Sequence, residues 1–207
     1  SEDGNGNNTA IGYETLKAQN AGAITYNVAV GHQAGLLVST GVGNTLIGAQ
    51  AGDALTTGEN NVAIGRLALS TEDTGHDNVA VGYQALTALN YNGSGYNTAV
   101  GRRAGYSVTT GIGNTIVGAS TGDALTTGSY NTAFGQNALS GEDAGSYNTA
   151  LGYQALNAMD AGADAYNVAV GHNAGVSVST GTLNTLVGAH VGDALTTGGR
   201  NIAIGYQ

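Results

Sequence analysis

The chain has 207 residues and a formal net charge of −9, with 14 acidic side chains against 5 Lys and Arg. Such acidity leaves no basic stripe to neutralise phosphates, which argues against nucleic acid and against anionic membrane surfaces as partners. The absence of Cys excludes disulfides and thiolate metal sites, and no run approaches 18 apolar residues, so no membrane insertion is expected.

A motif of Asn, three strand-forming residues and Gly recurs along the whole chain at a nearly fixed spacing. Successive Asn are separated by 19, 17, 17 and 17 residues, and this order then repeats, so a short unit is nested in a super-repeat of 70 residues. A period this short predicts one supersecondary unit stacked many times rather than an ordinary globular core. The twelve Asn are Asn8, Asn27, Asn44, Asn61, Asn78, Asn97, Asn114, Asn131, Asn148, Asn167, Asn184 and Asn201.

Four types of unit recur in the same order. The first type has 19 residues and the others have 17; the third carries the string GDALTTG, and the fourth carries an acidic pair such as Glu72-Asp73. We therefore interpret 1–207 as a single array of three super-repeats. They cover about 8–77, 78–147 and 148–207, and residues 1–7 resemble the tail of a preceding unit.

Within each unit, the three residues after the Asn favour a strand: Thr, Val or Ile, then Ala, Leu or Ile, then an apolar residue. The Gly that follows suits a corner where φ is positive or where backbones approach closely. A second short strand is expected after it, on segments such as 84–86 and 54–56. Helix is not expected, because the apolar pattern is short and Gly recurs every few residues. The twelve corner glycines are Gly12, Gly31, Gly48, Gly65, Gly82, Gly101, Gly118, Gly135, Gly152, Gly171, Gly188 and Gly205.

Two short strands and two Gly corners per unit predict one rung of an all-β fold, a parallel β-solenoid or β-roll. About 12 rungs of 17–19 residues, stacked ~4.8 Å apart, make a rod of roughly 58 Å. Equivalent residues then lie above one another, so the Asn side chains should form an internal amide ladder, each bonding to the next rung. The alternative is that each Asn only favours a turn. We favour the ladder because neither Asp nor Ser replaces any of the twelve.

The strands are apolar on both faces. Side chains alternate between the faces of a strand, and the second position is mostly Ala while the third holds larger residues such as Ile11 and Ile47. Strands that are apolar on both faces are usually covered on both. We therefore expect the larger residues to fill the solenoid and the Ala-lined face to pack against another copy.

The two ends of the sequence match different parts of the fourth unit type. Residues 1–7 resemble its tail and residues 201–207 resemble its head. Solenoids normally carry divergent polar caps, since a bare end exposes strand edges that template association. No cap sequence is visible, which favours either a segment of a longer fibre or head-to-tail stacking into an open filament.

The strand segments NTAVG, NVAIG and NTALG, followed by YQAL or NAL, resemble two known groups of proteins. One is the head of trimeric autotransporter adhesins, and the other is the set of N-T-A-I-G-Y-Q-A-L repeats in phage and bacterial fibre proteins. The resemblance spans nearly the whole chain, over five to nine residues per rung. It implies an extracellular β-roll that forms trimers and serves as a shaft or in adhesion.

The 11 Tyr residues are the remaining surface feature. Tyr26, Tyr96 and Tyr166 end the long units, whose two extra residues should bulge outward. Exposed aromatic residues can pack against neighbouring rods, and we predict these three as a possible assembly surface. The alternatives are that Tyr residues cover the edges of the solenoid or that they stack on glycans.

The acidic pairs offer calcium as an alternative role. Glu72-Asp73 and Glu142-Asp143, with Glu2-Asp3 as a partial copy, lie near Gly in turn-like segments. However, neither an EF-hand loop nor a G-G-x-G-x-D nonapeptide occurs, and Asp is a common turn residue. We therefore expect no cofactor and no metal site, with calcium as the alternative.

No catalytic residues are predicted. General acid–base catalysis needs an asymmetric cluster, whereas the carboxylates here recur at the 70-residue period or stand alone. His32 and His172 follow corner glycines, but the copy between them has Arg102, so we expect surface polar residues instead of a His ladder. Thr pairs raise an ice-binding interpretation, yet the long units lack them.

These observations predict a structural protein and not an enzyme. The expected function is a subunit of an extracellular filament or fibre that assembles by rung stacking end to end and by lateral packing. The alternative is the shaft or head of a trimeric adhesin or phage tail fibre that binds surface glycans. The expected partner is a second copy, in a homopolymer or homotrimer, with glycans as a further candidate. The expected location is extracellular, on the cell surface or in a virion fibre.

Overall fold

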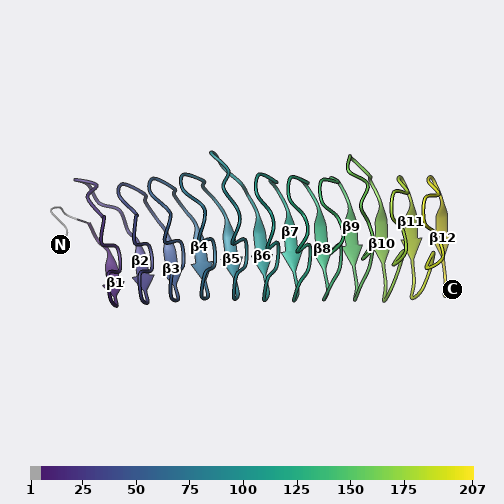
Figure 1. Cartoon of the computed structure of the whole chain (residues 1–207), viewed down its shortest axis with the longest axis horizontal. Coiled ribbons are helices and arrows are strands. Elements are labelled where there is room, and N and C mark those ends of the chain that lie inside the picture. The colour runs from purple at the N-terminus through teal and green to yellow at the C-terminus, as the bar shows by residue number, and fades with distance from the viewer. Residues whose placement is uncertain (1–5) are drawn as a thin grey trace.

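The computed structural model describes residues 6–207, and these residues form a rod of stacked rungs (Figure 1). One parallel sheet of twelve strands follows chain order from β1 to β12, and the described residues contain no helix. The predicted all-β parallel β-solenoid is therefore confirmed. Each strand has three residues: β1 (Thr9–Ile11), β2 (Val28–Val30), β3 (Thr45–Ile47), β4 (Val62–Ile64), β5 (Val79–Val81), β6 (Thr98–Val100), β7 (Thr115–Val117), β8 (Thr132–Phe134), β9 (Thr149–Leu151), β10 (Val168–Val170), β11 (Thr185–Val187) and β12 (Ile202–Ile204).

The rungs are stacked in register, so equivalent residues of neighbouring repeats lie one above another. Ala80 pairs with Ala99 and Val81 with Val100, although the unit between them has two extra residues. Figure 1 shows where those residues go: the loops near β5 and β9 project beyond the loops of the other rungs, as predicted for the long units. The insertions therefore leave the sheet unchanged.

The expected second strand does not form. Segment 84–86 is a turn, in which Gln84 and Leu86 are left-handed, with φ 57° and 48°. Segment 54–56 is irregular and follows a turn in which Gln50 and Gly52 are left-handed. The turns still bond to the next rung: the Leu86 amide donates to the Ala104 carbonyl at 3.1 Å. A left-handed Leu costs ~1–2 kcal/mol, but the Leu86 side chain is fully buried in the core.

The expectation for the two faces of the sheet was wrong. The second strand position faces the interior, where Ala29 and Leu46 are 0% exposed, while the third position faces outward, with Ile11 60% and Phe134 58% exposed. Ala lies inside because the large core side chains come from the turns, among them Leu69, Leu86 and Leu125. A three-residue strand shows alternation but does not show which face is the inner one.

The super-repeat of 70 residues has a packing reason. Where the inward strand residue is large, as at Leu46, the turn of the same rung carries Gly at the matching inner position: a Cβ on Gly52 would lie 2.7 Å from Leu46 Cδ2. In the fourth rung type the strand residue is Ala63, and the turn leucine Leu69 is buried in its place. The second rung type has small residues at both positions, and a Cβ on its Gly35 would lie 2.7 Å from Leu46 Cδ1 of the next rung. Rung types therefore complement one another in volume, as close-packed interiors require.

The corner glycines bring neighbouring backbones close together. Gly65 has φ 132°, and a Cβ there would lie 2.5 Å from the carbonyl oxygen of Gly82 in the next rung. Gly205, at φ 145°, has the same backbone conformation with nothing within 4 Å of a Cβ. The sequence prediction for these glycines was positive φ or close approach of backbones; Gly65 shows both, and Gly205 shows positive φ alone.

This difference gives a matched pair of substitutions. We expect Gly65→Ala to lower the free energy of unfolding by about 2–6 kcal/mol, because it adds a clash with the Gly82 carbonyl to the strain of a backbone conformation that is essentially restricted to Gly. Gly205→Ala should cost only the strain, about 1–3 kcal/mol. Urea unfolding at matched protein concentration measures both, and equal losses would show that the inter-rung contact contributes nothing.

Candidate functional site

The Asn residues form a continuous buried ladder at the start of the strands. In each step the side-chain Oδ1 accepts the backbone N–H of the Asn one rung further along: Asn114 receives the amide of Asn131 at 2.9 Å, and Asn167 receives that of Asn184 at 3.0 Å. Eleven such bonds connect Asn8 to Asn201. The predicted ladder is confirmed, and its side chains are almost fully buried from Asn27 to Asn184.

The other end of each amide closes its own rung. Asn114 Nδ2 donates to the carbonyl of Gly128 at 2.9 Å, and Asn44 Nδ2 donates to that of Gly58 at 2.8 Å. One Asn therefore satisfies an amide of the next rung and a carbonyl across its own rung, while a second, longer contact joins neighbouring side chains, as between Asn114 Nδ2 and Asn97 Oδ1 at 3.2 Å. Asp lacks the donor and Ser lacks the reach for both bonds.

The long rungs interrupt this second bond. Asn78 Nδ2 donates to the carbonyl of His76, two residues before it, at 2.9 Å, and Asn148 Nδ2 has no partner among the described residues. The two extra residues displace the carbonyl that would close the rung. The ladder itself continues, because Asn148 Oδ1 still accepts the amide of Asn167 at 3.1 Å.

The glutamates of the acidic pairs are core residues. Glu72 and Glu142 are fully buried and lie seven residues after a corner glycine, where other rungs have Leu55, Leu89 or Leu125. Glu72 Oε1 accepts the Gly75 amide at 2.8 Å, and its Oε2 accepts the Tyr91 amide of the following long rung at 3.1 Å.

This arrangement bears on the calcium alternative. The carboxylate oxygens of Glu72 and Glu142 face N–H donors, and Asp73 Oδ1 accepts the Thr56 hydroxyl at 2.5 Å. Among the described residues, no group of three or more His, Asp or Glu could hold a metal ion. Glu2 and Asp3, the partial third copy, lie outside the described residues. Burial raises the pKa of Glu142, against the opposing effect of the Gly145 amide.

The first and third strand positions form the outer sheet face. It runs the length of the rod and consists of Thr, Val, Ile, one Leu and one Phe, with no charged side chain among the described strands. Sequence reasoning assigned most of this face to the interior. The size of the strand residues could have corrected this assignment, because an inner position beside bulky turn leucines accepts Ala more easily than Ile.

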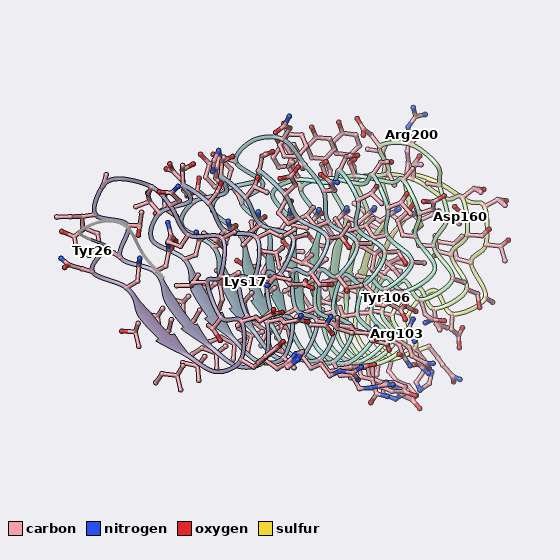
Figure 2. All side chains as sticks on the ribbon, turned by 60° about the vertical axis from the view of Figure 1, so that its left-hand side comes forward. Lys17, Tyr26, Arg103, Tyr106, Asp160 and Arg200 are labelled. Atoms are coloured by element: carbon pink, nitrogen blue, oxygen red, sulfur yellow. The ribbon has the colours of Figure 1, made fainter. Side chains whose placement is uncertain are left out.

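A row of rings and cations follows the corner glycines. Tyr13 stacks on His32 with centroids 5.3 Å apart, and Tyr153 stacks on His172 at 5.2 Å. His172 also contacts His190 at 5.1 Å, so these histidines, although on the surface as predicted, are not isolated. Arg103, two residues after the corner glycine Gly101, lies over the ring of Tyr106 at 4.3 Å from its centroid, and both residues are labelled in Figure 2.

The three tyrosines that end the long rungs are exposed, as predicted for Tyr26, Tyr96 and Tyr166. All three have positive φ, between 50° and 54°, and lie directly before a ladder Asn. They do not form a row by themselves, because they are separated by four rungs. Tyr166 instead stacks on Tyr147 of the preceding rung, a contact that sequence reasoning missed.

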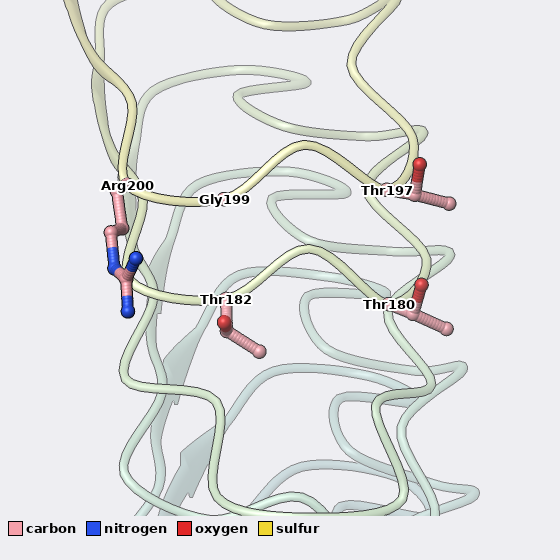
Figure 3. Close-up of a pocket in the computed structure, with 5 residues that line it drawn as sticks. All are labelled: Thr180, Thr182, Thr197, Gly199 and Arg200. Carbon is pink, nitrogen blue, oxygen red and sulfur yellow. The ribbon is translucent and has the colours of Figure 1, made fainter.

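One hollow of about 310 Å³ lies between two rungs near the C-terminal end, lined by Thr180, Thr182, Thr197, Gly199 and Arg200. Figure 3 shows Thr197 above Thr180 and Gly199 above Thr182, with Arg200 at one side. The lining holds hydroxyls and a single guanidinium, without an acid–base pair.

The described residues also hold no helix that is long and apolar enough to cross a membrane.

Compared with protein-family models, with curated proteins and with solved structures, the chain has no significant match. The fold therefore stands on the structure alone, and the resemblance to adhesin heads and fibre repeats stays a prediction.

The Asn ladder can be tested at a central rung. Asn114→Ala leaves the Asn131 amide and the Gly128 carbonyl without partners in a buried place, and each unpaired group costs ~1–3 kcal/mol. We expect a loss of about 3 kcal/mol in the free energy of unfolding. Asn201→Ala, at an exposed Asn of the same row, is the control and should change little. Urea unfolding decides, and similar small losses in both variants would contradict the ladder.

The buried carboxyl of Glu142 predicts a pH dependence. Its raised pKa means that the folded state holds the proton more tightly than the unfolded chain, so the associated stability is present below the unfolded pKa and is lost as pH rises through the folded pKa. Glu142→Gln should flatten the decline in stability from about pH 4 to neutral pH. The carboxyls of Asp53 and Asp123, whose pKa values burial also raises, leave a residual slope.

Thermal melts across this pH range measure the effect, with the exposed Glu59→Gln as control. A Glu142→Gln profile parallel to that of the unmodified protein would show that Glu142 carries no such linkage.

Proposed function

We propose that this chain is a structural rod, a subunit of an extracellular filament or fibre whose copies associate laterally through the outer sheet face. The observation that carries the proposal is the continuous uncharged face along twelve strands, on which Ile11, Ile47, Val100 and Phe134 are exposed. Contiguous exposed apolar patches of several hundred Å² mark interaction sites on soluble proteins. The partner in this proposal is a second copy of the chain.

The size of the face supports that occupant. Twelve strands at ~4.8 Å spacing and three residues at ~3.3 Å give a surface of roughly 570 Å² per copy. Two such faces bury about 1,100 Å² together, near the lower limit of a specific interface. The outer sheet face also carries no charged side chain. Two copies, each with a net charge of −9, repel one another where their acidic sides meet, so the uncharged face is the side on which they can approach.

End-to-end stacking completes the proposed assembly. β1 and β12 are the outermost strands of the described array, and each pairs on one side only among the described residues. Open strand edges template further pairing, and the Asn ladder offers the same bonds to any further rung of the same type. A continuation of this kind, whether from one chain or from several, makes a longer rod without a new contact type.

The alternative is the shaft or head of a trimeric adhesin or tail fibre that binds glycans. Exposed rings in the row after the corner glycines, among them Tyr13, Tyr83 and Tyr206, favour it, because aromatic faces can stack on sugars. Both functions place the protein outside the cell, on its surface or in a virion fibre. Electron microscopy distinguishes them: long filaments support the first, and discrete short rods that bind a glycan array support the second.

Lateral association through the outer sheet face has a direct test. We expect the purified chain to sediment as a dimer, a trimer or a larger species, and the double variant Val100→Lys with Phe134→Lys to shift to monomer, since the added charges must be desolvated in the interface. Leu37→Lys, at an exposed leucine of a turn, is the matched control. A monomer at every concentration before mutation, or association unaffected by the double variant, would contradict the proposed interface.

A further inference from the structure

The residues that directly precede the ladder Asn form a second row along the rod, here named the pre-Asn row. From Tyr26 to Arg200, every member has a left-handed backbone, with φ between 50° and 71°. Because the rungs are in register, the side chains of this row lie above one another on the surface, where Figure 2 labels two of them, Tyr26 and Arg200. From β2 to β12 the row reads Tyr26, Gly43, Asn60, Asp77, Tyr96, Gly113, Tyr130, Tyr147, Tyr166, Leu183 and Arg200.

Three consecutive members of the pre-Asn row are tyrosines, and their rings are stacked. The centroids of Tyr130 and Tyr147 are 5.4 Å apart with planes at 12°, and those of Tyr147 and Tyr166 are 4.9 Å apart with planes at 1°. All three remain accessible, at 51%, 42% and 49% exposure. A solvent-borne oxidant can therefore reach phenol rings that are already held face to face.

A carboxylate lies beside the closer pair. The pKa of the Tyr166 phenol is raised by desolvation, and then by the charges of Asp164 and Tyr147 and by a hydrogen bond to Asp164. Asp164 stands two residues before Tyr166 and is the carboxylate that can take up the phenolic proton when Tyr166 loses an electron, as a general base does. The equivalent residues in the two earlier long rungs are Ser94 and Ile24, neither of which can take a proton in this way.

We propose that Tyr147 and Tyr166 are a site of oxidative cross-linking, at which a dityrosine bond joins two neighbouring rungs. Each phenol gives up one electron and one proton to become a phenoxyl radical, and the two radicals form a carbon–carbon bond between the ring positions ortho to their hydroxyls. The hydrogens at those carbons then move as protons to the phenolic oxygens and restore both aromatic rings. The oxidant is a peroxide with a haem peroxidase, and the peroxide takes up the two electrons and two protons and leaves as water.

The position of this pair explains why the bond should form here rather than elsewhere. A stacked neighbour has an effective concentration far above that of a second molecule in dilute solution. Tyr96, the counterpart of Tyr166 one super-repeat earlier, has Asp77 and Gly113 as its neighbours in the row and therefore no ring to couple with. The chain has no Cys, so a covalent link between its rungs must use another side chain.

To test for the cross-link, the full chain is treated at micromolar concentration with hydrogen peroxide and a haem peroxidase. The product is denatured and cut before Asp residues, which places Tyr147 in the peptide 143–159 and Tyr166 in the peptide 164–192. We expect these two peptides to be recovered joined, with a mass lower than their sum by two hydrogen atoms. Dityrosine fluorescence of the undigested chain follows the yield.

Two substitutions make the test specific. Tyr147→Phe keeps the ring stack but removes the phenol, and it should reduce the dityrosine fluorescence by about tenfold. Tyr96→Phe is the matched control and should leave it unchanged. The proposal is overturned if the joined peptides are absent from the oxidised chain, if links between different molecules predominate, or if Tyr147→Phe and Tyr96→Phe lower the yield equally.

Discussion

The structure depends on one constraint: each rung must lie in register with the next at two positions, the ladder Asn before the strand and the corner glycine after it. At the start of the strand, the Asn side chain accepts an amide of the next rung, as Asn114 does from Asn131. At the end of the strand, the corner glycines bring backbones together with no room for a Cβ, as between Gly65 and Gly82. These two rows fix the register, and the chain between them can vary in length, which is why the long rungs with two extra residues leave the sheet intact.

Because the rungs are stacked in register, equivalent residues of successive repeats lie in a row along the rod. The surface therefore consists of rows, each with its own residue types. The outer sheet face consists of uncharged and mostly β-branched residues, the row after the corner glycines collects Tyr, His and Arg, and the pre-Asn row stacks three tyrosines. A binding surface built in this way is extended and repetitive instead of concave. It suits contact with another rod or a long polymer better than it suits a small substrate, for which a pocket with converging groups is the usual site.

The period of the sequence was enough to predict the solenoid, the Asn ladder and the glycine corners, because each needs the same residue in every rung. The alternation of the strands alone did not predict the orientation of the sheet, since three residues alternate equally well in either sense. The small residues at the second position indicate it only when turn leucines such as Leu86 are recognised as the bulky core. The missing second strand has a similar cause: left-handed φ at Gln84 and Leu86 is not visible in residues that are neither Gly nor Asn. Glu72 was assigned to a turn because its core position shows only when it is aligned with Leu55 and Leu89. The Tyr147–Tyr166 stack was predictable, since both residues directly precede a ladder Asn.

The measurement that tests the account most directly is native-state hydrogen exchange at the ladder amides. In ordinary strands the protected amides donate to backbone carbonyls, whereas the backbone amides of Asn44, Asn114 and Asn184 donate to side-chain oxygens of the preceding rung. We expect these amides to exchange as slowly as those of the central strands, because they open only when rungs separate. Exchange at the rate of exposed turn amides would contradict the ladder and, with it, the stacking on which the proposed assembly rests.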